Sequence, residues 1–231
     1  NLLTAITEYE GIEERLKKVG CYAFLNYSVS LKDQNVSSFY QKVIEAVAQK
    51  SKHLVFFTLE LASMEDIPHD PNLLKYSTWI KHIRAFRPYY LSSELEKFLL
   101  EKNLSSKDAW IKLYDETLAS IAFDFDGKKL GISEITDLIS HEEGNVREKA
   151  ALSLSKGLEK NMHLFTSIMN ALLKDNNTEN NWRKFDKPES FRHVLNDTTQ
   201  EIVDSLVSAC EENYKNLSHK YYDLKAKALK K

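Results

Sequence analysis

The stretch of this chain that comes closest to a metal-ligand motif is His141-Glu142-Glu143-Gly144-Asn145. A zinc ion that activates water needs two histidines one helical turn apart with a glutamate between them, so that both imidazoles reach one metal. Here Asn145 stands in the place of the second histidine, and Gly144 interrupts a helix. We therefore interpret this stretch as a loop followed by a helix cap and predict no metal site in it.

The other histidines stand alone. None has a second His, Cys or carboxylate at a spacing that supports a closed coordination sphere, and lone histidines are more often surface or core residues; they are His53, His69, His82, His163, His193 and His219. We predict no metal ligand and no catalytic residue in this chain, and the sequence singles out no residue for substrate binding.

Asp124 and Asp126 are a pair of carboxylates on one face of an expected hairpin, and such pairs can perform acid-base chemistry or hold a cation. Their position beside Gly127 favours turn formation instead. Nucleophilic catalysis is not indicated, because the chain has no G-x-S-x-G motif. Its six glycines are isolated, so a phosphate-binding loop is not indicated either. Cys21 and Cys210 are far apart in sequence, and we expect buried free thiols.

Length and composition are those of an ordinary globular protein. The chain has 231 residues with 42% hydrophobic content, enough for a sizeable core. Its 32 basic and 34 acidic residues balance, so neither nucleic acid nor an anionic membrane is an expected partner. No run approaches the roughly 18 apolar residues of a membrane span, and we expect a cytoplasmic protein.

The first 90 residues are expected to form helices. Apolar residues at helical spacing predict one helix from Leu2 to Val19, interrupted at Gly20, and a second over 39–57. Residues 63–71 break the pattern, because Asp70 can cap a helix that begins with Pro71. This third helix carries core aromatics and ends near Pro88.

The central stretch, residues 91–161, reads as helix, helix, hairpin, short helix and long helix. Ser93 stands three residues before Glu96, and Asn145 three before Glu148, which predicts two capped helix starts. Residues 121–125 alternate apolar and polar, Asp126-Gly127 can form a tight turn, and residues 128–130 return, which predicts a β-hairpin. We expect Arg147, which follows a cap, to hydrogen-bond main-chain carbonyls or a carboxylate at the turn before its helix.

The remaining residues continue the helical pattern. One long helix is expected over 146–176, a polar loop over 176–181, and a final helix capped by Thr198 with Glu201. Apolar residues of the final helix keep helical spacing to the last turn, without a Gly cap or a Pro stop. This pattern predicts that the chain is a fragment and that the exposed helix could form a homodimer. The expected fold is all-α: packed antiparallel helices with one small β-hairpin near 121–130.

An ordered set of residues then points to a family. The set is Leu91-Ser92, Glu94-Leu95-Glu96, Ala109-Trp110, Leu113-Tyr114-Asp115, the 123–127 hairpin, Val146-Arg147 and Ala150, followed by Asn170, Arg183, Pro188, Arg192, Asn196, Tyr221-Tyr222 and Leu224-Lys225-Ala226. In order and spacing the residues up to Ala150 resemble the small N-terminal domain of the oligoendopeptidase F family, zinc metallopeptidases related to thimet oligopeptidase. The residues from Asn170 onward resemble, more weakly, the family's approach to its catalytic domain. The resemblance implies three parts: an N-terminal helical region over 1–90, the family's small N-terminal domain over 91–161, and the truncated start of the helical catalytic domain over 162–231.

The resemblance also implies a function. The parent protein would be a zinc metalloendopeptidase that hydrolyses short unstructured oligopeptides, and this part would wall the substrate channel. The zinc and its H-E-x-x-H motif would belong to the missing C-terminal catalytic domain, which is the expected partner of this chain. The chain alone would bind no zinc and be inactive. The alternative is a non-catalytic helical scaffold that binds a partner through an exposed aromatic face.

Overall fold

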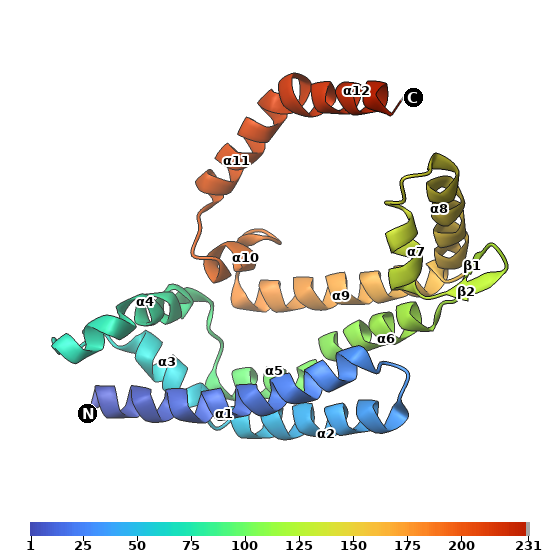
Figure 1. Ribbon diagram of the computed structural model, residues 1–231. Helices are drawn as coiled ribbons and strands as arrows, with labels where there is room; N and C mark the ends of the chain where they lie inside the picture. The colour runs from blue at the N-terminus through green and yellow to red at the C-terminus, as the bar shows by residue number, and fades with distance from the viewer. Residues whose placement is uncertain (230–231) are drawn as a thin grey trace.

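The structure is a computed structural model that describes residues 1–229. It consists of helices and a single two-stranded sheet within that range, so the predicted all-α class with one small hairpin is confirmed (Figure 1). Among the described residues, no helix combines the length and apolar character that crossing a bilayer requires.

The chain opens with an antiparallel pair of long helices, α1 (Leu2–Val29) and α2 (Gln34–Ser51). Asp33 caps α2, because its Oδ1 accepts a hydrogen bond of 2.8 Å from the amide of Asn35. The predicted interruption at Gly20 was wrong, since α1 runs through it. A glycine lowers helix stability by only about 1 kcal/mol relative to alanine, and packing of α1 on α2 outweighs this.

A cluster of short helices follows: α3 (Val55–Ser63), η1 (Pro71–Tyr76), α4 (Ser77–Ala85) and η2 (Arg87–Tyr89). The helix predicted over 39–57 is therefore split between α2 and α3. The predicted cap at Asp70 is confirmed, because its Oδ1 accepts a hydrogen bond of 2.8 Å from the amide of Asn72.

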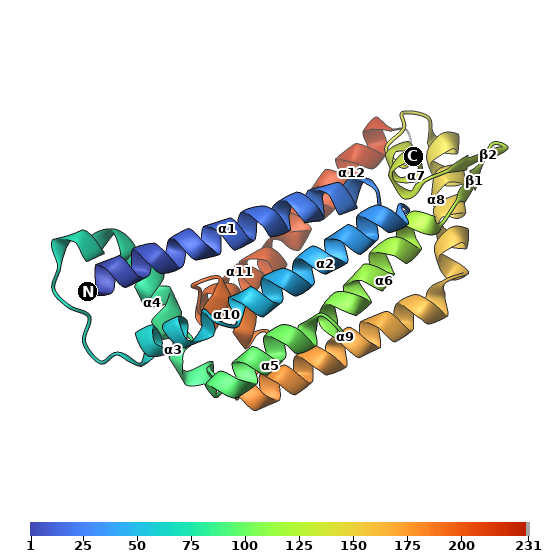
Figure 2. The ribbon, with the colours of Figure 1, turned by 90° about the horizontal axis from the view of Figure 1, so that it is seen from below.

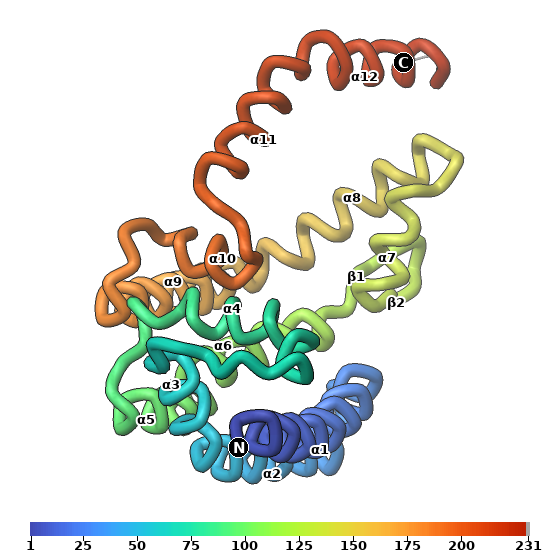
Figure 3. The backbone as a smooth tube through the Cα atoms, turned by 90° about the vertical axis from the view of Figure 1, so that its left-hand side faces the viewer, coloured from blue at the N-terminus to red at the C-terminus, as the bar shows by residue number. Residues whose placement is uncertain are grey.

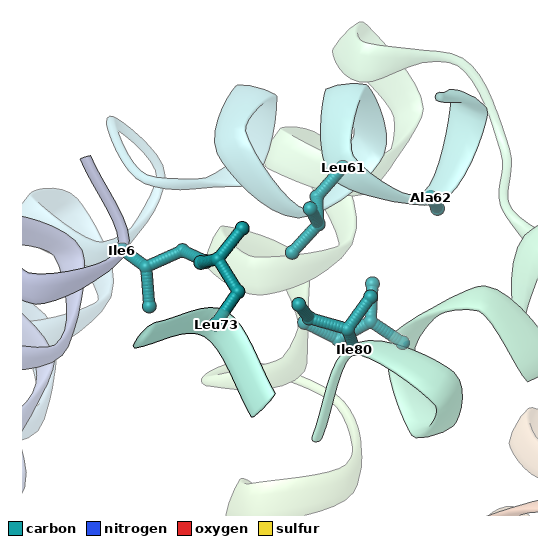
Figure 4. Packing of buried hydrophobic residues seen from close by; sticks show 6 residues of the cluster. Ile6, Leu61, Ala62, Leu73 and Ile80 are labelled. Atoms are coloured by element: carbon teal, nitrogen blue, oxygen red, sulfur yellow. The ribbon is translucent and has the colours of Figure 1, made fainter. Parts of the chain in front are cut away.

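The first hydrophobic core joins these short helices to the start of α1. Figure 4 shows Ile6 of α1, Leu61 of α3, Leu73 of η1 and Ile80 of α4 pointing toward one another. All four side chains are buried. Burial of apolar surface is the main force that holds this end of the chain together.

Two helices then cross the middle of the molecule, α5 (Ser93–Asn103) and α6 (Lys107–Ser120). The cap of α5 is Ser92 and not the predicted Ser93: the Ser92 Oγ accepts a hydrogen bond from the amide of Leu95 at 3.4 Å. Glu96 accepts a hydrogen bond of 2.9 Å from the amide of Leu91, so the reciprocal capping by a glutamate exists but is displaced by one residue.

The hairpin prediction is confirmed. Strands β1 (Phe123–Phe125) and β2 (Lys128–Leu130) pair antiparallel, with Phe123 opposite Leu130. Asp126 and Gly127 form the turn at φ 45° and 81°. Helices α7 (Ile132–Leu138) and α8 (Gly144–Glu159) pack on the hairpin around a second core of Phe123, Ile135 and Ala150.

Two predictions about the next segment were wrong. The helix expected over 146–176 is divided at residues 160–161 into α8 and α9 (Met162–Arg183), and the expected polar loop 176–181 lies inside α9. Tertiary contacts explain the second error. Asn180 is buried and donates a hydrogen bond of 3.2 Å to the carbonyl of Pro188, so the asparagine-rich stretch is held as helix despite its low propensity.

The chain ends in a long helical arm that follows α10 (Ser190–Leu195). The arm contains α11 (Gln200–Asn213), the π-helical turn η3 (Tyr214–Ser218) and α12 (His219–Ala228). The N-cap of α11 is Thr199 and not the predicted Thr198, because the Thr199 Oγ1 accepts a hydrogen bond from the amide of Ile202 at 3.4 Å. Figures 1 and 3 show the arm rising from α10 and bending back in the direction of α7 and α8.

Seen from below, α2, α6 and α9 run side by side, so they form a layer from which the hairpin and α8 project at one end (Figure 2). The arm lies above this layer in Figure 1. The layer, the hairpin with α8 and the arm therefore surround one common face of the chain.

Candidate functional site

The stretch that came closest to a metal motif is a loop followed by a helix start, as interpreted. The Nδ1 atom of His141 accepts a hydrogen bond of 3.1 Å from the amide of Glu143. The predicted cap at Asn145 was wrong, because α8 already begins at Gly144 with Glu143 as its N-cap and without a side-chain cap bond. The loop is stabilised instead by an arginine from the helix.

Arg147 has the role that its position predicted. Its Nη1 donates hydrogen bonds to the carbonyl of His141 at 2.6 Å and to that of Glu142 at 2.7 Å. A charged guanidinium makes stronger hydrogen bonds than a neutral donor, so Arg147 fixes the turn between α7 and α8.

Replacing Arg147 by alanine is expected to destabilise the chain by about 2 kcal/mol, because two charge-assisted hydrogen bonds to the turn are lost. Urea unfolding measures the change. Lys156→Ala is the matched control, since it removes an exposed positive charge from the same helix. Equal midpoints for the two variants would show that the Arg147 bonds contribute nothing to stability.

The aspartates of the hairpin are surface residues paired with lysines. Asp124 lies 2.5 Å from the Nζ of Lys129, and Asp126 lies 3.0 Å from that of Lys149. The hydrogen bond and charge of Lys129 lower the pKa of Asp124. The left-handed φ of Asp126 agrees with the turn interpretation.

Other chemistry-bearing residues are dispersed. No group of three or more His, Cys, Asp or Glu side chains within residues 1–229 is arranged to hold a metal ion. The prediction of buried thiols was wrong, because Cys21 and Cys210 are both exposed. Cys21 lies on α1, and Cys210 belongs to the arm, where most residues are exposed.

A groove of about 1120 Å³ lies between α1 and the η1–α4 segment. Tyr9 and Trp79 line it with ring centroids 5.9 Å apart. The hydroxyl of Tyr76 donates to Glu10 at 3.0 Å, and that of Tyr9 to Glu13 at 3.3 Å. Burial, followed by the charge of Glu13, raises the pKa of Tyr9.

A second groove of about 400 Å³ lies between the α1–α2 pair and α6. Glu116 accepts hydrogen bonds there from the hydroxyls of Tyr27 at 3.3 Å and Ser37 at 3.2 Å. Burial raises the pKa values of the neighbouring Asp108 and Asp115. Both grooves present hydrogen-bond acceptors and the faces of aromatic rings, and these features are suited to binding a ligand. Sequence analysis missed them, because their walls come from segments far apart in the chain.

Comparison with known proteins adds the decisive observation. Residues 58–123 match the family model described as oligopeptidase F. This segment is similar to oligopeptidase F. It contains α4, α5, α6 and the start of β1, which include part of the residues that carried the resemblance. The resemblance to this family is thereby confirmed. No curated protein matches the sequence significantly.

Solved structures extend the likeness from residues 58–123 to the rest of the fold. The crystal structure of oligoendopeptidase-F from Enterococcus faecium superposes with a TM-score of 0.86 at 20% identity, covering 100% of this chain and 48% of that one. A protein from Chlamydophila abortus assigned as a peptidase has a TM-score of 0.68 at 16% identity, with 99% and 40% covered. The chain thus spans about half the length, or less, of the solved structures that it matches. At these identities the likeness shows the fold.

Proposed function

We propose that this chain is the N-terminal portion of a zinc metalloendopeptidase that hydrolyses short unstructured oligopeptides. The observation that carries the proposal is the match of the entire chain to oligoendopeptidase-F at a TM-score of 0.86, together with the oligopeptidase F match over residues 58–123. In this proposal residues 1–229 wall one side of the substrate channel. The chemistry is performed by the remainder of a longer polypeptide.

The shape of the chain supports the proposed role as one wall of a substrate channel. The α9 layer, the hairpin with α8, and the arm lie around a common face (Figure 1). A wall built of packed helices would admit an extended peptide and exclude a folded domain by size. This explains in physical terms why such an enzyme would be limited to short unstructured substrates.

The exposed apolar residues of the arm support the proposal that this chain is part of a larger polypeptide. Leu206, Leu217 and Leu224 of the arm are 64–67% exposed. Apolar side chains at helical spacing form a stripe that water solvates poorly, and such a stripe favours a covering surface. Since the chain covers 48% of the E. faecium protein, we assign this covering surface to the other half of the longer polypeptide. Homodimerisation through the arm is the competing outcome.

The residues present do not fit a zinc site, since none of the His, Cys, Asp and Glu side chains in residues 1–229 form a group that could ligate one. In the proposal the zinc ligands therefore lie outside this chain, in an H-E-x-x-H motif of the catalytic portion. When bound there, the metal would supply an activated water. The residues described above contribute walls and binding surfaces only.

The proposal predicts that the chain alone neither binds zinc stoichiometrically nor cleaves peptides, because both require a ligand set that it lacks. The measurement is a fluorogenic peptide assay with added zinc, performed on residues 1–231 and on the polypeptide encoded by the complete reading frame. We expect turnover that a chelator abolishes in the longer protein alone.

Two results would contradict this proposal. Chelator-sensitive turnover by residues 1–231 alone would place the metal site in this chain. A complete reading frame without H-E-x-x-H would refute the metallopeptidase assignment and favour the helical scaffold. Chelator-insensitive turnover would also refute the assignment, in favour of a peptidase that needs no metal. Light scattering on residues 1–231 separates the two explanations of the arm, since a homodimer would be seen directly.

A further inference from the structure

The most completely paired charged side chain of the described structure is Arg183, at the end of α9. Its Nη1 and Nη2 donate to the two carboxylate oxygens of Glu96 at 2.6 and 3.0 Å. Its Nε donates to Glu179 at 2.7 Å, and Nη1 also donates to the carbonyl of Tyr89 at 3.3 Å. One guanidinium therefore ties α9 to both α5 and η2.

Burial makes this contact strong and specific. The side chains of Arg183 and Glu96 are only 13% and 14% exposed. Burial alone would lower the pKa of Arg183, but the hydrogen bonds and charges of Glu96 and Glu179 raise it, so the guanidinium stays charged. A buried bidentate pair accepts few other geometries, and loss of one partner leaves a buried charge without compensation.

The segment that follows Arg183 is held to the body by few other contacts. We call residues 185–196, which include α10, the strap. Phe185 stacks on Tyr89 with ring centroids 4.0 Å apart, and Phe191 lies 6.0 Å from Phe86. Asn180 bonds the carbonyl of Pro188. Beyond the strap, the arm projects away from the body (Figure 3).

Two features suit the strap to local opening. The residues that bound it, Lys184 and Asp197, have left-handed backbones at φ 62° and 49°, which residues other than glycine adopt at an energetic cost. His193 lies within the strap, and its Nε2 is buried without a hydrogen-bond partner among the described residues. Opening would relax both backbones and hydrate the imidazole, and it is opposed by the aromatic contacts of the strap with Tyr89 and Phe86. Arg183 acts on the first of these contacts, because it holds the Tyr89 carbonyl.

We propose that the Arg183–Glu96 pair is a latch that keeps the strap closed on the body, and that breaking it opens the strap as one cooperative unit while the hairpin core stays folded. The arm, which continues directly from the strap, would then lose its fixed direction. The inference concerns contacts within this chain and does not depend on the proposed peptidase function.

Hydrogen exchange on residues 1–231 tests the latch in Glu96→Gln and Arg183→Gln. We expect exchange of the strap amides, such as that of His193, to rise about a hundredfold in Arg183→Gln, because the buried Glu96 carboxylate is left without its partner, and to rise less in Glu96→Gln, where Arg183 keeps Glu179. Exchange of β1 and α8 should remain within about twofold of the wild type. The charge-reversed double variant E96R/R183E should recover part of the strap protection, which a loss of packing alone would not do.

Glu101→Gln is the matched control, since it breaks the half-exposed Lys52–Glu101 ion pair from the same helix as Glu96. Strap exchange equal to that of this control would overturn the latch, and so would an equal rise over the whole chain. Should Arg183→Gln fail to fold, Arg183→Lys keeps the charge but cannot reach Glu96, Glu179 and Tyr89 together. Wild-type exchange of the strap in Arg183→Lys would likewise overturn the proposal.

Discussion

Replacing Gly157 by alanine is expected to lower the free energy of unfolding by about 3 kcal/mol, a large effect for one added methyl group. A Cβ at this position would lie 2.5 Å and 2.6 Å from two ring carbons of Phe123, and 3.4 Å from Ile121. The Phe123 ring is 1% exposed and packs in the second core, so it cannot move away from a new methyl group without displacing its neighbours. The residues around the hairpin must therefore shift.

Chemical denaturation measures this change, and a matched glycine serves as control. Gly20 also lies in a helix, but a Cβ there would meet no atom within 4 Å. Gly20→Ala should stabilise the chain by about 0.5 to 1 kcal/mol through helix propensity alone. The double variant G157A/F123L, with a smaller side chain opposite the new methyl, should be less destabilised than additivity predicts. Stabilisation by Gly157→Ala would mean that α8 does not approach the hairpin this closely.

Leu61→Ala is expected to destabilise the first core by about 3 kcal/mol, because the removed atoms leave a cavity among well-packed side chains. Leu61 is 1% exposed and packs with Ile6, Leu73 and Ile80, which come from three other helices. Its loss should therefore weaken the attachment of η1 and α4 to the start of α1.

Leu74→Ala is the control for this variant, since Leu74 follows directly after a core residue but is 72% exposed. Its effect should lie within about 0.5 kcal/mol of zero. Thermal unfolding monitored by circular dichroism compares the two. If both variants melt at the same temperature, Leu61 is not part of a closely packed core.

Features governed by neighbours in sequence could be predicted from the residues alone. The turn at Asp126-Gly127 needs positive φ, the cap at Asp70 needs an acceptor two residues before an amide, and Arg147 needs carbonyls at the preceding turn. Each depends on groups only a few positions apart, so residue type and spacing are sufficient. The family was also recognisable, because its ordered residues are a property of the sequence.

Features that depend on distant partners could be decided only by the tertiary structure. The asparagine-rich end of α9 is helical because Asn180 and Arg183 find partners outside the helix, at Pro188 and Glu96. Arg183 and Glu96 are separated by 87 positions in the chain. Local helix propensity carries no information about such a contact. It also does not predict the break between α8 and α9 at residues 160–161, or the groove between α1 and α4. The physical reason is that burial and ion pairing stabilise residues according to their neighbours in space. These neighbours are set only once the helices have packed.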